Sequence, residues 1–189
     1  MPPMPSQQAL IVLAATLDDH RHRSAAAAAV EALAPRYRVE VIDLLASGFV
    51  PAMSSAERRA YHDAEPILDP EVRRHAGLIV KSTVVVFVYP TAWWSPPPVL
   101  KAWLERVLVP GVGFVFDERN RVRPNLRDLR AIVGVTSYRQ PRPLRRWGGD
   151  GGRHMLHRAL RLNVPHRVRR LWITGDPLAD RVHSELEQL

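Results

Sequence analysis

Residues Ser82 to Gly113 read STVVVFVYPTAWWSPPPVLKAWLERVLVPGVG, and the rest of the predicted fold is arranged around this segment. The run Thr83–Tyr89 is unbroken β-branched and aromatic sequence, which is typical of a parallel strand covered on both faces. Pro90 is predicted to end this strand, and the prolines at 96–98 suit the start of a helix, where a missing amide costs nothing. Apolar residues then recur at three- and four-residue spacing, which predicts an amphipathic helix that ends at Pro110-Gly111.

The tip between this strand and this helix is a candidate ligand site. In open α/β sheets, ligands bind where such loops leave the carboxyl ends of the strands. The tip carries Trp93 and Trp94, and each aromatic side chain buries about 150–250 Å² when it is packed. Either the two rings plug the end of the core or a subunit contact, or they line a flat heteroaromatic ligand. A phosphate is not expected here, because the prolines at 96–98 remove the N–H groups that would bind it.

Residues 89–114, YPTAWWSPPPVLKAWLERVLVPGVGF, closely resemble the signature of the flavodoxin-like NAD(P)H:quinone oxidoreductases. In that family a Pro-x-x-Trp-aromatic motif precedes a Pro-rich helix with Leu-Lys-x-Trp and a Pro/His-Gly turn. Residues 43–62, DLLASGFVPAMSSAERRAYH, also resemble the family, whose second strand is followed by Asp-Leu, a Gly-Phe-x-Pro turn and a helix. The resemblance implies that the isoalloxazine ring of a flavin lies against Pro90, Thr91, Ala92, Trp93 and Trp94.

A second candidate site follows the first predicted strand. Residues 20–24 read HRHRS, and Ser24 is predicted to cap an alanine-rich helix over 24–33. Cations at the positive end of a helix dipole are unfavourable unless an anion binds there, so a phosphate at Ser24 and the first-turn amides would resolve the conflict. The resemblance implies that the FMN phosphate is held by His22 and Ser24 with Arg21 or Arg23. The alternative is that Asp18 and Asp19 neutralise the arginines in a solvated loop.

The remaining pattern predicts an α/β three-layer sandwich. Strands are predicted at 9–15, 37–44, 83–89, 129–136 and 170–175, and further helices at 71–81, 153–162 and 178–189, with a short helix capped by Ser54 or Ser55. Residues 117–128 are predicted to form a polar loop. Five strands alternating with helices favour a parallel sheet in the flavodoxin order 2-1-3-4-5. We expect a single flavodoxin-like domain over residues 1–189, in which 1–8 form a flexible tail without the features of a signal peptide.

The exit of the fourth strand is the predicted third wall of the site. Members of the family commonly have Thr-Thr-Gly-Gly here, so Thr136 and Ser137 match, whereas Tyr138 and Arg139 replace the glycines. Tyr138 is the candidate catalytic residue, either through a hydrogen bond to a quinone oxygen or in a packing role only. The GGDGG run at 148–152 follows no strand, so it is predicted to be a flexible linker and not a nucleotide-binding loop.

The composition limits the possible functions. The chain has no cysteine, which excludes disulfides, thiol nucleophiles and Cys-ligated metal centres. Redox chemistry would therefore need a borrowed cofactor. No window approaches 18 apolar residues, so no membrane span is expected. His154 and His157 share a helix face without a third ligand, and no metal site is expected.

The net charge of +8 and the pI near 10.9 raise the question of nucleic acid as a partner. Arginines are spread along the chain with alanine and proline, which argues against a nucleic-acid-binding face. They accumulate in the final third, at Arg139, Arg142, Arg145, Arg146, Arg153, Arg158, Arg161, Arg167, Arg169 and Arg170. This group is either a solvated or partner-facing surface, or it attracts phosphorylated NAD(P)H.

The resemblance implies a cytoplasmic, FMN-dependent NAD(P)H:quinone oxidoreductase, with FMN preferred over FAD. NAD(P)H would give hydride to flavin N5, and a quinone would then take two electrons. The family is usually dimeric, so we expect a homodimer in which the third loop with Trp147 contributes to the other subunit's site. The alternatives are a reductase of azo or nitro compounds, a flavin-binding regulatory subunit of a transport system, and a basic nucleic-acid-binding protein.

Overall fold

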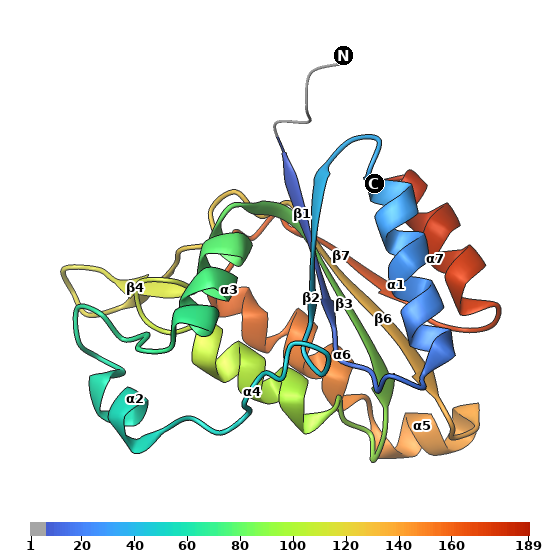
Figure 1. The fold of residues 1–189 in the computed structure, drawn as a ribbon, viewed down its shortest axis with the longest axis horizontal. Coiled ribbons are helices and arrows are strands. Elements are labelled where there is room, and N and C mark those ends of the chain that lie inside the picture. Colours follow the sequence, from blue (N-terminus) through green and yellow to red (C-terminus); the bar gives the residue numbers. More distant parts are fainter. Residues whose placement is uncertain (1–6) are drawn as a thin grey trace.

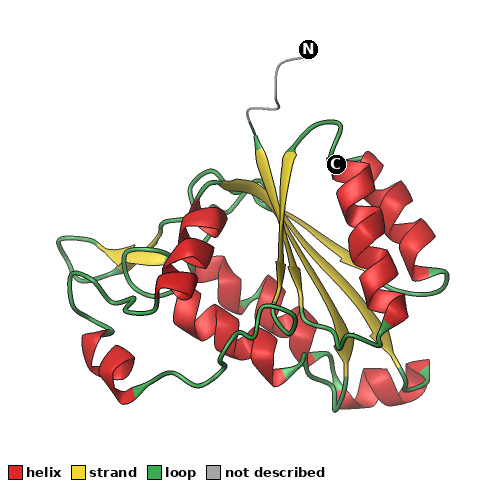
Figure 2. Cartoon of the chain, in the orientation of Figure 1, coloured by secondary structure: helices red, strands yellow, loops and turns green. Residues whose placement is uncertain are grey.

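Five parallel strands form the centre of the molecule (Figure 1 and Figure 2). The computed structural model describes residues 7–189. Adjacent strands lie in the order β2-β1-β3-β6-β7, which is 2-1-3-4-5 when the strands of this sheet are numbered along the chain. They are β1 (Gln8–Leu13), β2 (Arg38–Asp43), β3 (Ser82–Thr91), β6 (Ala131–Tyr138) and β7 (Arg169–Ile173). The predicted fold class and strand order are confirmed.

Helices cover both faces of the sheet and complete three layers (Figure 1). One face carries α1 (His20–Leu33) and α7 (Leu178–Glu187), and the other carries α3 (Pro70–Val80), α4 (Pro98–Val107) and α6 (Gly151–His157). The short helix α5 (Arg142–Gly148) lies at the carboxyl edge of the sheet. Beyond α3 and α4 lie α2 (Ser55–Ala60) and a hairpin formed by β4 (Phe114–Phe116) and β5 (Val122–Pro124). A 3-10 turn spans Ala159–Leu162. Within residues 7–189, no helix is both long and apolar enough to cross a membrane.

Each strand sends alternate side chains to the two faces, as the period of a strand requires. Leu10 and Val12 of β1 belong to the core under α3, α4 and α6, whereas Ile11 and Leu13 belong to the core under α1 and α7. The alanine-rich face of α1 is buried against the second core, and its small side chains allow a close approach to the sheet. The unbroken apolar runs in the sequence therefore reflect a sheet that is covered on both sides.

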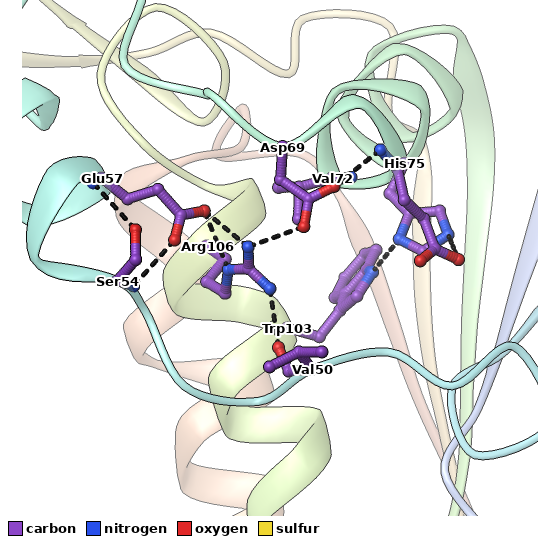
Figure 3. Close-up of polar contacts among 9 residues, drawn as sticks. Val50, Ser54, Glu57, Asp69, Val72, His75, Trp103 and Arg106 are labelled. Atoms are coloured by element: carbon purple, nitrogen blue, oxygen red, sulfur yellow. Dashed lines mark hydrogen bonds and ion pairs between the residues drawn. The ribbon is translucent and has the colours of Figure 1, made fainter.

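The buried side chain of Arg106 on α4 contacts residues at the starts of α2 and α3 (Figure 3). Nη2 of Arg106 donates to Glu57 Oε1 at 2.5 Å and to Asp69 Oδ2 at 2.9 Å, and Nη1 donates to the carbonyl of Val50 at 2.6 Å. Glu57 also forms a capping box with Ser54 at the start of α2. Ser54 is one of the two residues that were predicted as the cap of this helix. Burial alone would raise the pKa of Glu57, but hydrogen bonds from Arg106 and Ser54 outweigh burial and hold that pKa below its usual range.

Two strands reach further than predicted at the carboxyl edge. Pro90 does not end β3, which continues to Thr91. Pairing with β1 stops at Val88, so Pro90 lies where β3 has a neighbour on one side only and the missing amide is tolerated. β6 likewise runs to Tyr138, which places Ser137 inside the strand and not in a loop after it.

The glycine run at 148–152 is a packed turn, and the prediction of a flexible linker is wrong. Gly148 ends α5, and the Asp150 side chain accepts from the amide of Arg153 to cap α6. A Cβ at Gly148 would meet the indole of Trp94 at 2.1 Å, and one at Gly152 would meet Tyr89 Oη at 2.3 Å. Glycine is therefore required here for close packing.

Three other predicted segments differ in part from the structure. The predicted polar loop 117–128 contains β5, the second strand of a small hairpin. The predicted helix 153–162 is divided into α6 and the 3-10 turn. Of the predicted tail 1–8, residues 1–6 lie outside the described residues, and Gln8 belongs to β1.

Candidate functional site

A cleft of about 990 Å³ opens beyond the carboxyl ends of β1, β3 and β6. This is the edge at which ligands bind in open α/β sheets, and the volume is that of a small-molecule site. The cleft is lined by Thr16, Asp18, Asp19, His20, Arg21, His22, Pro90, Thr91, Ala92, Trp93, Trp94, Ser137, Tyr138, Arg139 and Gln140.

A tight turn at the end of β3 displays one tryptophan towards solvent. The amide of Ala92 donates to the carbonyl of Ser95 at 3.0 Å, and the reverse bond measures 2.9 Å. The two central residues, Trp93 and Trp94, have φ angles of 50° and 56°, a region that costs a residue with a side chain roughly 1–2 kcal/mol. Trp93 is 85% exposed, so it does not plug the core. Unfavourable backbone conformations of this kind are commonly found where a side chain binds a ligand or a partner.

Trp94 connects this turn to α5 and α6. Its ring packs edge-on against Trp147, with ring centroids 6.5 Å apart. Its indole N–H donates to the carbonyl of Leu144 at 3.4 Å, and its own carbonyl accepts from the amide of Gly151 at 2.7 Å. The glycine run beyond α5 thus contacts the tryptophan turn, whose residues Trp93 and Trp94 line the cleft.

The predicted cap of α1 is wrong. The helix begins at His20, one turn before Ser24, and Asp19 is the cap whose side chain accepts from the amide of His22 at 3.1 Å. The positive charges of the HRHRS segment are balanced by carboxylates: Arg21 pairs with Asp176 and Arg23 with Asp43, each at 2.5 Å.

His22 lies beneath the cleft between two polar partners. Its Nδ1 is 2.8 Å from Asp19 Oδ2, and its Nε2 is 3.1 Å from Ser137 Oγ. Burial lowers the pKa of His22, and the neighbouring Asp19 only partly opposes this effect. The side chain is therefore a neutral imidazole at pH 7.

The hydroxyl of Tyr138 is already engaged at the back of the cleft. It donates to Asp150 Oδ2 and accepts from Nε1 of Trp172 at 2.9 Å. A hydrogen bond from this hydroxyl to a quinone would require that its proton leave Asp150. Tyr138 lines the cleft.

The structure brings nine of the twelve predicted site residues to the cleft: Arg21, His22, Pro90, Thr91, Ala92, Trp93, Trp94, Ser137 and Tyr138. Arg23 and Ser24 do not line it, because the earlier start of α1 places them in a later part of the helix. Thr136 is fully buried, and its hydroxyl lies 2.8 Å from that of Thr91 beneath the cleft floor. Sequence reasoning missed Asp19 and His20, although an Asp one residue before a basic helix start is itself a capping signal.

The cleft suits a flat, anionic heteroaromatic cofactor such as FMN. The aromatic residues of the tryptophan turn and Tyr138 at the end of β6 line the cleft, and the cationic side chains Arg21 and Arg139 line it as well. Asp19 already occupies the N-terminus of α1, so a phosphate would be bound by side-chain cations and not by the first-turn amides. Within residues 7–189, no group of three or more His, Cys, Asp or Glu side chains is arranged to hold a metal ion.

Comparison with curated proteins finds quinone dehydrogenases and an ancillary protein of a potassium-efflux system. NAD(P)H dehydrogenase (quinone) 1 of Rattus norvegicus is 29% identical over 171 residues, covering 81% of this chain and 58% of the relative. The glutathione-regulated potassium-efflux system ancillary protein KefF of Salmonella arizonae is 29% identical over 59 residues, covering 31% of this chain and 34% of KefF. The chain spans a little over half of the length of the quinone dehydrogenases that it matches.

Comparison with solved structures shows the same fold over nearly the whole chain. The NAD(P)H:quinone oxidoreductase from Methanothermobacter marburgensis superposes with a TM-score of 0.75 at 20% identity, covering 97% of this chain and 96% of that protein. An FMN-dependent NADH-azoreductase from Bacillus anthracis, in complex with FMN, gives a TM-score of 0.67 at 15% identity and covers 96% of each chain. A family model described as a flavodoxin-like fold matches residues 7–161, and the chain therefore belongs to the Flavodoxin_2 family.

Proposed function

We propose that this protein is an FMN-dependent NAD(P)H:quinone oxidoreductase. The observation that carries the proposal is the tryptophan turn, which holds Trp93 in a strained and exposed position over a cleft of cofactor size. The relatives named above as quinone dehydrogenases support the reaction class, and the similar azoreductase structure with FMN supports the cofactor. A cytoplasmic location, with access to NAD(P)H, is part of the proposal.

The chain's own residues would position the reactants. Bound FMN would accept hydride from NAD(P)H and deliver two electrons to a quinone. The Trp93 ring and the backbone of Pro90, Thr91 and Ala92 would face the isoalloxazine. Trp94 would hold the turn in place through its contacts to α5 and α6. Ser137 and Tyr138 would close the third side, and a role of Tyr138 as hydrogen-bond donor to the quinone remains a prediction.

The phosphate of FMN should depend on Arg21 and not on Arg23. Arg21 lines the cleft, whereas Arg23 pairs with Asp43 outside it. A charge-assisted hydrogen bond contributes about 1.5–3 kcal/mol, and the exposure of Arg21 reduces this value. We expect Arg21→Ala to weaken FMN binding about fivefold to tenfold and to leave riboflavin binding unchanged, with Arg23→Ala as the charge-matched control. Equal losses for FMN and riboflavin in a fluorescence titration would contradict this assignment.

Replacing Trp93 tests the proposed function most simply. We expect Trp93→Gly to melt at or above the temperature of the wild type in the absence of FMN, because the ring is exposed and glycine adopts a φ of 50° without cost. Its affinity for FMN should fall about tenfold to a hundredfold, since stacking of an aromatic ring on a base contributes roughly 1–3 kcal/mol. Both quantities can be measured by calorimetry.

Trp93→Phe is the matched control, because it keeps an aromatic face and should recover most of the affinity. A large drop in the melting temperature of Trp93→Gly without FMN, combined with wild-type FMN affinity, would show that Trp93 serves the fold and would remove the main support for the proposal.

We also propose that the protein is a homodimer. Trp147 is 83% exposed and Leu144 is 48% exposed, both on α5 beside the cleft, so the wall held by Trp94 presents apolar area to a second copy. Trp147→Ser is expected to shift the protein from dimer to monomer and to weaken FMN binding. Light scattering at micromolar concentration measures this, and a wild-type monomer that retains FMN would contradict it.

Two other functions of the same cleft remain as candidates. Similarity to an azoreductase structure supports azo or nitro compounds as electron acceptors, and the short match to KefF supports a regulatory role in a transport system. Steady NAD(P)H oxidation with a quinone or azo compound by the isolated protein favours an enzyme. A regulatory subunit would bind FMN but would need its partner to act.

A further inference from the structure

The segment that runs from α6 through β7 is strongly basic. Residues 151–175 contain six arginines and three histidines but no aspartate or glutamate. Arg153, Arg158, Arg161 and Arg167 are exposed, and within the part of the chain that the structure describes none of the four forms an ion pair with a carboxylate. None of them lines the cleft, so they do not hold a cofactor or NAD(P)H there. Their positive charge is therefore available to a partner outside the cleft.

Part of this charge is arranged along one side of the chain at the end of α6. The amide of Arg158 donates to the carbonyl of His154 at 2.8 Å, and the amide of Arg161 donates to the carbonyl of Arg158 at 3.1 Å. Residues that are bonded in this way lie one above the other along a helical turn. Leu162 follows Arg161 directly and is 63% exposed. These four exposed residues, His154, Arg158, Arg161 and Leu162, form a stripe that we call the basic stripe.

The hairpin of β4 and β5 borders the basic stripe and carries further apolar surface. β5 packs against the 3-10 turn, and the amide of Leu126 donates to the carbonyl of Asn163 at 3.0 Å. On the hairpin, Phe116 and Val122 pair across the two strands and are 44% and 41% exposed. Exposed apolar side chains therefore occur on both of these neighbouring elements.

Cations combined with exposed aliphatic side chains fit an anionic lipid surface. Arginine binds lipid phosphate, and a leucine beside it can enter the boundary of the acyl chains, as in helices that lie on membranes. A nucleic acid offers phosphates but no apolar phase for Leu162. A second copy of this chain would bring like charges together at a two-fold contact on the basic stripe. The charge and the apolar surface together thus favour lipid over either alternative.

We propose that the basic stripe docks this protein on an anionic membrane surface. Arg158 and Arg161 contact the lipid headgroups, and Leu162 enters the boundary between the headgroups and the acyl chains. The contact is reversible and weakens with ionic strength, because salt screens exposed charges. It concerns a surface outside the cleft and does not depend on the proposed function.

The test is sedimentation of the protein with vesicles of phosphatidylcholine alone or with one third phosphatidylglycerol. The wild type is expected to bind the anionic vesicles only. Each arginine close to an anionic bilayer contributes about fivefold to the affinity, so Arg158→Ser combined with Arg161→Ser should weaken binding about twentyfold to thirtyfold. The same variant should show a weaker dependence on salt. Arg158→Lys combined with Arg161→Lys keeps the charge and should bind within about twofold of the wild type.

The matched control removes two arginines elsewhere. Arg38→Ser lies on β2, at the opposite edge of the sheet from β7, and Arg181→Ser lies on α7, on the other face of the sheet. This double variant has the same net charge and should bind like the wild type, because exposed charges act over about 10 Å at 0.1 M salt. Leu162→Ser should lose about threefold to tenfold in affinity with an unchanged salt dependence, because it removes apolar burial only.

The proposal is overturned if the wild type binds both kinds of vesicle equally or binds neither, or if the control loses as much affinity as Arg158→Ser with Arg161→Ser. Tighter binding to poly(U) than to anionic vesicles at equal phosphate concentration, unaffected by Leu162→Ser, would make the basic stripe a nucleic-acid site instead. All of these variants are expected to bind FMN as the wild type does, because none of the replaced residues lines the cleft. Vesicle binding and FMN binding can therefore fail separately.

Discussion

Arg106→Met is expected to lower the free energy of unfolding by about 3–5 kcal/mol, because it leaves two carboxylates without their partner in a buried network. Arg106 is 5% exposed and donates to Glu57, Asp69 and the carbonyl of Val50 (Figure 3). Two of these partners belong to the starts of α2 and α3, so the variant weakens both helix caps as well. Chemical denaturation monitored by circular dichroism measures the loss.

Lys101→Met is the matched control, because Lys101 lies on the same helix and pairs with Glu105 at the surface. Exposed pairs of this kind contribute little, and we expect a change within about 0.5 kcal/mol. Adding Glu57→Gln to Arg106→Met should recover part of the stability by removing one uncompensated charge. A loss below about 1 kcal/mol for Arg106→Met would show that the network does not hold these helices together.

Acid is expected to destabilise the protein through His75. This side chain is fully buried in α3, and its Nδ1 accepts from the indole N–H of Trp103 at 3.2 Å, which requires a neutral imidazole. Burial, assisted by Arg74, lowers the pKa of His75 to about 4 from an ordinary value near 6.5. Because the unfolded chain binds the proton more tightly, stability is full above pH 6.5 and falls as the pH drops towards 4, by about 3 kcal/mol.

His75→Gln isolates this effect, because glutamine keeps an acceptor for Trp103 and does not titrate in this range. Between pH 6.5 and 4 the variant should lose about 3 kcal/mol less than the wild type, whatever its stability at pH 7. Parallel loss of stability in both proteins across this interval would assign the acid sensitivity to other groups.

Local sequence predicted those parts of the fold that depend on the period of apolar residues. The run Thr83–Tyr89 could only be buried on both faces, and β3 lies at the centre of the sheet as that pattern requires. The start of α1 was predicted wrongly, although the contact that decides it is local. α1 begins at His20 because Asp19 both caps the helix and binds the ring of His22, whereas the alanines after Ser24 fix only the helix body.

The site was predictable where the sequence concentrates unusual residues on one loop, as at Trp93 and Trp94. It was not predictable where function depends on which side of a strand a residue faces. Thr136 and Ser137 are adjacent, yet one is buried beneath Thr91 and the other lines the cleft. This alternation follows because β6 continues two residues past its predicted end at 136, so that neighbouring side chains point to opposite sides. The contact between His22 and Ser137 joins residues 115 positions apart, and no local pattern encodes it.

Whether the cleft holds a redox-active flavin can be measured by an anaerobic titration of the protein reconstituted with FMN. We predict that the protein retains FMN through gel filtration, that NAD(P)H bleaches the visible absorbance of the bound flavin with one equivalent, and that a quinone restores it. Failure to retain FMN, or a bound flavin that NAD(P)H does not reduce, would contradict the assignment of this cleft as the active site of an NAD(P)H:quinone oxidoreductase.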